Sequence, residues 1–343
     1  MRYFGPGARF EKNGNRMRKT RLIVLSALTL ALLLVGAHAG EKPSVPRLGI
    51  LLPESGRAES QAVKGLREGL RDLRHQEGKS LQIEIRDAKG DRSALKQEAN
   101  DLVRQKVQLI FTTGTRATQA AKAGTAEIPI VFNHPADPAA LGLVKSLKRP
   151  GGNVTGVAAF SLQMTERRLQ ILKEMVPKAR RVTIFYDANN RYSQENFLSV
   201  KKAAVKLKLE VEERAIKSAD ELKKSIANLQ QTEGSALFHI PDDLIESQAD
   251  FIIEAAREKR WPTMFSDESL VTKGGLASYE PSYYQMGRVG ARLADKILKG
   301  AKPQELPVEK AGKFDLLINL RTANGIGLSI PGDLLKRADR VIR

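Results

Sequence analysis

A repeated order of apolar strand, tight turn and helix between Ile110 and Phe160 is the feature that most restricts the fold of this chain. An apolar strand ends in the small polar turn at 112–115 (TTGT), and an alanine-rich helix follows. A second apolar strand, Ile128–Phe132, then runs into residues 133–138 (NHPADP). This order is typical of a parallel α/β sheet. Ligands of such sheets bind beyond the carboxyl ends of the strands, where both turns are expected.

The same order recurs along the chain and predicts two lobes. A length of 343 residues suggests about two domains of roughly 150 residues each. The helix expected over roughly Glu59 to Arg74 carries apolar residues at spacings of three and four, which indicates one buried stripe. The expected strands are residues 48–52, 81–86, 109–112, 128–132, 154–158, 181–186, 209–215, 236–240, 263–266, 276–279 and 315–320. Two Rossmann-like lobes of similar size imply a cleft between them.

The residue types and motifs exclude several kinds of chemistry. The chain contains no cysteine, so neither a disulfide nor a cysteine-ligated metal is expected. The four histidines do not stand at metal-ligand spacing. The chain also lacks a Gly-x-Ser-x-Gly elbow, a Walker A loop, a Gly-x-Gly-x-x-Gly fingerprint and a His-Glu-x-x-His helix. We therefore expect no catalytic residue, no metal and no cofactor.

The net charge of +18 first suggests a nucleic acid or an anionic membrane surface as partner. However, seven of the 57 Lys and Arg residues and one of the 39 Asp and Glu residues lie in residues 1–39. The other cations are spread along helix faces without interleaved aromatic residues, and no helix-turn-helix or RNA-binding signature is present. This distribution favours solvated surface charge, and we expect no nucleic-acid partner.

Residues 17–39 have the pattern of a secretory signal peptide. A basic segment at 17–21 (MRKTR) precedes the apolar run Leu22–Val35, and Ala37-His38-Ala39 has the small-x-small form of a cleavage site. The run is shorter than the about 20 residues that a membrane span needs, although an uncleaved anchor is the alternative interpretation. Met1 and Met17 both remain possible starts. We expect cleavage near Ala39 and a mature chain in the periplasm.

Three stretches of the mature chain closely resemble the ABC transporter substrate-binding protein family with a type I periplasmic-binding fold, which includes tryptophan-binding members. They are the turn at 113–115 with its alanine-rich helix, residues 128–156, and a tail that contains 274–279 (GGLASY), 296–303 (KILKGAKP), 306–309 (LPVE) and 317–320 (LINL). The resemblance covers about residues 47–343. One departure is residues 133–135 (NHP), where family members often carry small or acidic residues.

This resemblance implies a particular organisation and role. The fold would consist of two hinged lobes, one of residues 46–157 plus 277–305 and the other of 158–276 plus 306–343. The protein would be a monomer that captures a small solute. It would deliver this solute to an ABC permease and its ATPase subunit, which are separate chains.

In the first lobe, the candidate ligand-binding residues follow the strand ends. Gly114 lets the backbone approach a ligand closely, and the helix start with the hydroxyls of Thr113 and Thr115 favours a ligand carboxylate. A simple helix N-cap is the alternative. The other candidates in this lobe are Asn133, His134, Asp137, Glu54 and Ser55. Asp137 has the alternative of capping the short helix after Pro138.

In the second lobe, polar residues also follow strands. Asp243 and Asp267 are the leading candidates for holding a ligand ammonium, because burying a cation without a counter-charge is costly. An N-cap is the alternative for each. Tyr186 and Asn189 are further candidates, with aromatic core packing as the alternative for Tyr186.

We expect binding by closure of the two lobes around the solute, with an amino acid or related carboxylate as the first choice. A peptide-like, nucleoside or aromatic-acid solute remains open. Two other functions also remain open. One is a ligand-binding partner of a membrane sensor, since this fold serves both roles, and the other is an exported enzyme on the same fold.

Overall fold

The computed structural model describes residues 45–53, 56–133, 137–159, 161–230 and 233–343, and it does not describe the side chains of 57–59, 161–163 and 243. The predicted signal peptide and the candidate site residues Glu54, Ser55 and His134 therefore lie outside the described residues. Within the described ranges, no helix is both long enough and apolar enough to cross a membrane.

The first lobe is built on an all-parallel sheet with the order β11-β5-β4-β3-β1-β2. Its strands are β1 (Arg47–Leu52), β2 (Gln82–Asp87), β3 (Leu109–Thr113), β4 (Ile130–Asn133), β5 (Val154–Ala158) and β11 (Glu309–Lys310). Its helices are α2 (Arg57–Asp72), α3 (Arg92–Arg104), α4 (Gly114–Gly124) and α11 (Tyr283–Leu298), with the 3-10 helix η1 (Pro303–Glu305). Strand order reverses between β1 and β3, which is where open α/β sheets bind ligands.

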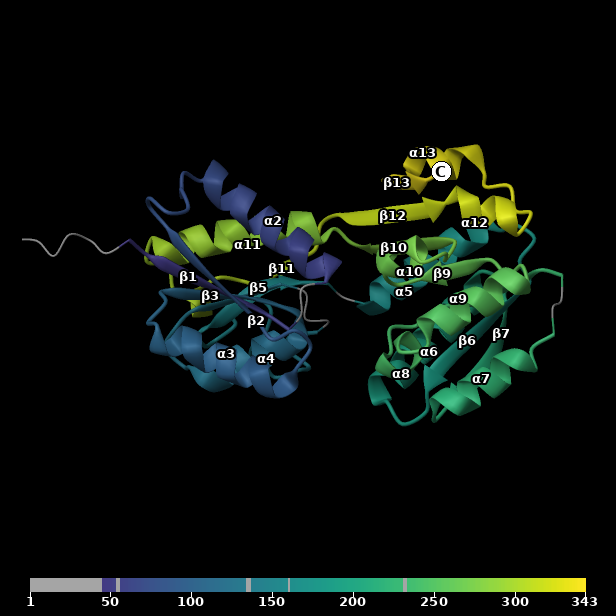
Figure 1. The fold of residues 1–343 in the computed structure, drawn as a ribbon, viewed down its shortest axis with the longest axis horizontal. Helices are drawn as coiled ribbons and strands as arrows, with labels where there is room; N and C mark the ends of the chain where they lie inside the picture. Colours follow the sequence, from purple (N-terminus) through teal and green to yellow (C-terminus); the bar gives the residue numbers. More distant parts are fainter. Residues whose placement is uncertain (1–44, 54–55, 134–136, 160, 231–232) are drawn as a thin grey trace, which may run out of the picture. The chain divides into compact units, whose positions relative to one another are not determined.

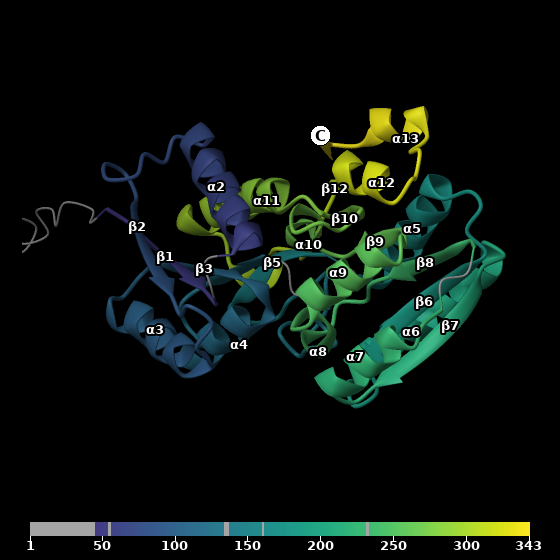
Figure 2. The same cartoon turned by 45° about the vertical axis from the view of Figure 1, so that its right-hand side comes forward.

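Alternation along the strands divides the core of this lobe into two layers. Leu48, Ile50 and Leu52 of β1 pack with α2 and α11 on one face, while Leu51 packs with α3 and α4 on the other. Successive strand residues point to opposite faces, so a strand of continuous apolar residues is buried on both sides. Figures 1 and 2 show α2 beside α11 and show α3 and α4 on the opposite side of the sheet.

The second lobe is built on a seven-stranded sheet with the order β13-β12-β10-β9-β8-β6-β7, in which only the β10–β12 pair is antiparallel. Its strands are β6 (Arg181–Asp187), β7 (Glu210–Ile216), β8 (Ser235–Phe238), β9 (Thr263–Phe265), β10 (Ala277–Pro281), β12 (Phe314–Asn319) and β13 (Arg340–Ile342). One layer of its core includes residues of α5 (Ser161–Met175), α6 (Arg191–Lys206), α12 (Leu320–Gly325) and α13 (Gly332–Arg337). The other includes residues of α7 (Ala219–Ala227), α8 (Asp243–Glu246), α9 (Ala249–Glu258) and α10 (Glu268–Thr272).

Two strands belong to other sheets than the predicted lobe boundaries assign. Residues 277–281 were expected in the first lobe, but β10 pairs with β9 and β12 in the second sheet. Residues 306–343 were expected in the second lobe, but Glu309 and Lys310 pair with Val157 and Ala158 at the edge of the first sheet. Pairing between strands far apart in sequence decides to which sheet β10 and β11 belong. Helical or strand periodicity along the sequence cannot predict such pairing.

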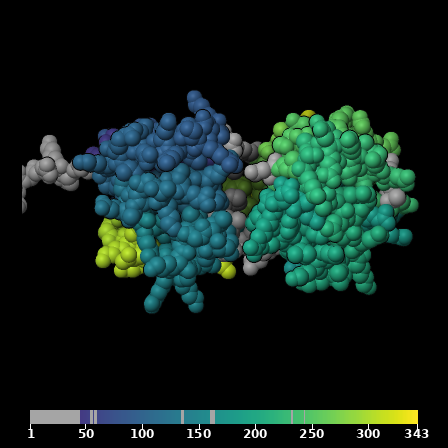
Figure 3. Space-filling model, turned by 90° about the horizontal axis from the view of Figure 1, so that it is seen from below, coloured from purple at the N-terminus to yellow at the C-terminus, as the bar shows by residue number. Residues whose placement is uncertain are grey.

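The lobes are nevertheless discontinuous in sequence, as the family resemblance implied. Helix α11 follows β10 of the second sheet, yet its buried face packs on the first sheet. In Figure 3, yellow-green residues near position 300 lie among blue residues of the first lobe. The two α/β units confirm the predicted fold class of two Rossmann-like lobes.

Candidate ligand-binding site

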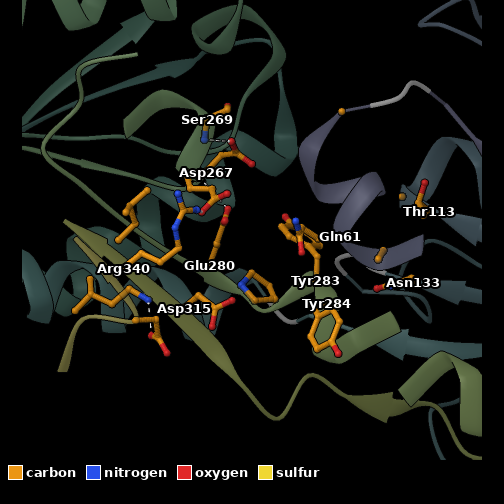
Figure 4. A pocket seen from close by; sticks show the side chains of 18 of the residues that line it. Gln61, Thr113, Asn133, Asp267, Ser269, Glu280, Tyr283, Tyr284, Asp315 and Arg340 are labelled. Carbon is orange, nitrogen blue, oxygen red and sulfur yellow. Dashed lines mark hydrogen bonds and ion pairs between the residues drawn. The ribbon is translucent and has the colours of Figure 1, made fainter. Parts of the chain in front are cut away.

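A cavity of about 660 Å³ lies at the strand ends of both sheets (Figure 4). The first lobe contributes Gly56, Gln61, Ala62, Thr113, Gly114, Arg116 and Asn133 to its lining. The second sheet, its helices and the start of α11 contribute Glu246, Asp267, Glu268, Ser269, Glu280, Pro281, Tyr283, Tyr284, Asp315, Leu316, Leu317, Asp339 and Arg340. These walls differ in charge, because all the carboxylates of the lining are in the second group.

On the wall from the first lobe, two buried side chains have polar atoms without a hydrogen-bond partner. Thr113 ends β3 and is paired in register with Asn133, which ends β4. They are 4% and 1% exposed, and neither Oγ1 of Thr113 nor Oδ1 and Nδ2 of Asn133 has a partner among the described residues. A buried polar atom without a partner costs about 1–3 kcal/mol. Such atoms at a cavity are suited to bonding a ligand.

The start of α4 adds an electropositive feature to this wall. Thr113 occupies the N-cap position, but its side chain makes no capping hydrogen bond. Gly114 follows with φ of 72°, a conformation that a residue with a Cβ adopts only with strain. The exposed side chain of Arg116 also lines the cavity. Uncapped helix N–H groups, the helix dipole and a nearby cation together favour an anion.

The wall from the second lobe is acidic, and part of its charge is already paired. Arg340 contacts Glu268 at 2.6 Å. Lys313 lies 3.6 Å from Asp315 and 3.3 Å from Asp339. The lining has six carboxylates, and the cations near them are Arg340, Lys313 and Arg168, which interacts with Glu280 and Glu246. Six negative charges against three positive ones leave this wall net negative.

Asp267 and Glu280 carry part of that charge at the centre of the wall. Oδ1 of Asp267 accepts a hydrogen bond of 2.7 Å from the N–H of Ser269 and caps α10. No ion pair joins Asp267 to a cation within the described residues. Glu280 is 5% exposed and accepts a bond of 3.2 Å from the N–H of Glu268. Figure 4 shows Asp267, Glu280, Asp315 and Arg340 on one side, with Thr113 and Asn133 on the other. This wall suits a ligand cation.

Among the residues that the structure describes, no group of three or more His, Asp or Glu side chains is arranged to hold a metal ion. Three carboxylates of the wall, Glu268, Asp315 and Asp339, are paired with arginine or lysine, and Asp267 and Glu280 accept hydrogen bonds from backbone N–H groups.

Four of the predicted site residues line this cavity together, namely Thr113, Gly114, Asn133 and Asp267. The backbone of Asp243 lies at the start of α8. Thr115 lies next to the lining residues but is not one of them.

Three predicted residues lie elsewhere, for physical reasons that their contacts give. Asp137 accepts hydrogen bonds from the N–H groups of Ala139 and Ala140, as in the capping alternative, but the segment that follows consists of turns and not of the short helix predicted after Pro138. Asn189 is exposed and outside the lining. Tyr186 stacks on Phe197 in the core with ring centroids 4.6 Å apart.

The hydroxyl of Tyr186 also has a partner within the fold. It donates to Oε1 of Glu213 at 2.6 Å. Burial, together with this bond, raises the pKa of Tyr186 to about 12. The side chain is therefore committed to the core and is not available for stacking on a ligand in the cavity.

Several residues that line the cavity were not predicted from the sequence. Glu280 directly follows the predicted strand 276–279, so the rule that ligands bind at strand ends applied to it as well. Tyr283 and Tyr284 begin a predicted helix that follows the same strand. Arg116 lies in the first turn of α4, directly after the predicted turn at 113–115, so the same rule extends to it. Asp339 and Arg340 gave no local signal, since only the pairing of β13 with β12 brings them to the site.

Two Rossmann-like lobes with a polar cavity at their strand ends define a ligand-binding protein with the type I periplasmic-binding fold. A model of the family described as ABC transporter substrate binding protein matches residues 47–342. The chain belongs to this family.

Several relatives share most of their length with this chain. The tyrosine-binding protein of Clostridioides difficile (strain R20291) is 29% identical over 268 residues, which are 78% of this chain and 77% of the relative. The crystal structure of an ABC domain in complex with L-Trp from Streptococcus pneumoniae has 26% identity and a TM-score of 0.74, covering 87% of this chain and 100% of the other. A ligand-free, open substrate-binding protein with adhesive properties from Clostridium difficile has 27% identity and a TM-score of 0.77, covering 87% and 99%.

Proposed function

We propose that this protein is the exported solute receptor of an ABC importer and that its ligand is a zwitterionic α-amino acid with an aromatic side chain. The observation that carries the proposal is the pair of buried, unpartnered side chains Thr113 and Asn133 at a cavity whose other wall is acidic. An amino acid supplies a carboxylate and an ammonium group, which match the two walls in charge.

The ligand carboxylate would bind at the first wall. Its oxygens would accept hydrogen bonds from Oγ1 of Thr113, Nδ2 of Asn133 and the N–H groups at the start of α4. Gly114 keeps this approach free of a side chain. Hydrogen bonds to a charged acceptor are about twice as strong as neutral ones, so this wall would supply a large share of the affinity.

The ligand ammonium would bind at the second wall, with Asp267 as its main counter-charge. Asp267 is held in place by its capping bond to Ser269, and its second carboxylate oxygen remains for the ligand. An anionic solute without an ammonium group would meet uncompensated negative charge at this wall, so a simple dicarboxylate is disfavoured.

Two lines of support favour an aromatic side chain. The relatives named above are a tyrosine-binding protein and a structure in complex with L-Trp. In addition, Tyr283 and Tyr284 line the cavity of this chain and provide surfaces for stacking, which adds about 0.5–1.5 kcal/mol beyond burial of area.

The role requires capture and release, with no bond made or broken and no cofactor. The ligand would bridge both walls and favour the closed arrangement of the lobes by its difference in affinity for the two states. A separate permease and ATPase would then take up the solute. Export through a signal peptide cleaved near Ala39 would place the protein, as a monomer, in the periplasm.

Thermal-shift and calorimetric titration of the purified protein, freed of ligand by unfolding and refolding, test this proposal. We expect aromatic L-α-amino acids to raise the melting temperature with increasing concentration, and dicarboxylates to leave it unchanged. Failure of every L-α-amino acid to bind would contradict the ligand class. Co-purification with a histidine kinase in place of a permease would contradict delivery to a transporter.

A further inference from the structure

A smaller cavity of about 140 Å³ adjoins the acidic wall and belongs to the second lobe and the segments that lead into it. It shares Asp267, Tyr283, Glu246 and Pro281 with the lining of the larger cavity. Its remaining lining is Ala159, Met164, Arg168, Tyr192, Pro241, Ser266 and Tyr279. It is thus a mostly aromatic and apolar recess that starts where the ligand ammonium is proposed to bind.

The recess also contains a buried cation, Arg168. This side chain is 2% exposed and lies over the ring of Phe238, with Cζ 5.3 Å from the ring centroid. Its guanidinium donates to the main-chain oxygen of His239 at 3.4 Å and to Oγ1 of Thr165 at 3.2 Å. A guanidinium has five N–H donors. Because Arg168 also lines the recess, its guanidinium is within reach of an acceptor that enters it.

The charges around Arg168 keep it cationic. Burial lowers the pKa of Arg168 to about 10, while Tyr192, Glu280, Tyr283 and Glu246 act in the opposite direction. The group is thus protonated at neutral pH, and two carboxylates near it prevent the recess from being a general anion site. A neutral oxygen that accepts a hydrogen bond fits this balance better than a second carboxylate would.

We propose that the recess receives the ring of the ligand and that Arg168 donates a hydrogen bond to an oxygen on that ring. This inference rests on the proposed function and makes it more specific, because the ligand becomes a phenolic amino acid of the tyrosine type. Phenylalanine offers no acceptor to the guanidinium. The indole N–H of tryptophan donates but does not accept.

The volume of the recess supports a single six-membered ring. Apolar cavities of about 150 Å³ in other proteins accommodate benzene, and this recess measures about 140 Å³. Indole is larger than benzene, so we expect it to fit this recess less well than a phenol ring does. Size and hydrogen bonding therefore select the same ligand.

The test compares affinities of the ligand-free, full-length exported protein for L-tyrosine, L-phenylalanine, L-tryptophan and L-alanine by calorimetry. We expect tyrosine to bind on the order of 10- to 100-fold more tightly than phenylalanine, the range for a hydrogen bond to a charged group. In the variant Arg168→Met this ratio should fall to about one while phenylalanine binding persists. Arg168→Lys, which retains a donor, should restore part of the ratio.

Two further variants keep the test decisive if Arg168→Met does not fold. Met164→Phe should fill the recess and weaken tyrosine binding while sparing alanine. Arg257→Met is the control, because Arg257 lies in α9, pairs with Glu254 and lines neither of these two cavities. It should leave the tyrosine-to-phenylalanine ratio unchanged.

The possible outcomes distinguish failure of this inference from failure of the proposed function as an amino-acid receptor. Equal or tighter binding of phenylalanine by the unmodified protein would overturn the inference and leave the amino-acid receptor intact. Equal loss of tyrosine and phenylalanine binding in Arg168→Met, with no change in their ratio, would assign Arg168 a purely structural role and also overturn it. Absence of binding by all four amino acids would overturn both.

Discussion

Gly287 of α11 lies directly against the main chain of Ala62 in α2, so that a Cβ atom on Gly287 would be 2.1 Å from the carbonyl oxygen of Ala62. The contact is reciprocal along the helix pair, because a Cβ on Gly65 of α2 would be 2.0 Å from the carbonyl oxygen of Tyr284. Ala62 and Tyr284 both line the larger cavity. The close helix contact therefore holds part of the cavity wall in position.

The variant Gly287→Ala should destabilise the protein. The new methyl group meets backbone, which cannot rotate away, and overpacking of this kind costs about 1–3 kcal/mol. Urea denaturation measures the loss. Gly325→Ala is the control, because no atom lies within 4 Å of a Cβ at this exposed position, and it should change stability by less than about 0.5 kcal/mol. Equal effects of the two substitutions would contradict the packing argument.

Replacing Thr113 by valine should weaken ligand binding without destabilising the ligand-free protein. The hydroxyl of Thr113 is buried without a partner, so its removal relieves a cost of about 1–3 kcal/mol. Titration with the best-binding amino acid and thermal melting measure the two effects.

The neighbouring residue provides the control for Thr113. Oγ1 of Thr112 bonds Oγ1 of Thr118 at 2.8 Å and is outside the cavity lining. Thr112→Val should therefore lower the melting temperature and leave the affinity nearly unchanged. The reverse pattern in this pair of variants would show that Thr113 is a structural residue.

The variant Asp267→Asn should lower the affinity for amino acids on the order of 10- to 100-fold, as expected for loss of a charged hydrogen-bond partner. Asparagine caps helices as well as aspartate does, so α10 should remain intact. Asp91→Asn is a matched control, since Asp91 caps α3 through the N–H groups of Ser93 and Ala94 and lies outside the cavity lining. An affinity unaffected by Asp267→Asn would move the ammonium site elsewhere.

His239 should make stability depend on pH below about 6.5. Burial, followed by the nearby charge of Arg168, lowers the pKa of His239 to about 3. The unfolded chain binds this proton at its ordinary pKa, so stability is complete above about pH 6.5 and is lost as pH falls towards 3, by about 1.4 kcal/mol per pH unit.

The measurement for His239 is denaturation at a series of pH values with His239→Gln beside the unmodified protein. The substituted protein should lack this contribution, so its stability should fall less steeply between pH 6 and 4. Proton resonances of the imidazole that titrate near pH 6.5 would refute the assignment.

Much of the architecture followed from local sequence patterns. The apolar runs at 48–52, 109–112 and 154–158 coincide with β1, β3 and β5, because strands buried on both faces are continuous in apolar residues. The turn after β3 was identified because ligands of parallel sheets bind beyond the carboxyl ends of the strands, and it carries Thr113 and Gly114 into the cavity. Asp267 was found by the same rule of strand ends.

The tertiary structure decided the features that depend on contacts distant in sequence. Pairing of β10 with β12 and of β11 with β5 sets where the chain passes between sheets, and these pairings join residues far apart along the chain. The assignment of Tyr186 to the core depended on Phe197 and Glu213, which its own neighbourhood in the sequence does not specify. The recess around Arg168 likewise exists because α5, β10 and the segments after β8 and β9 meet there. The periodicity of apolar residues indicates which side of a helix or strand is buried. Which residues pack against that side is decided only by the tertiary fold.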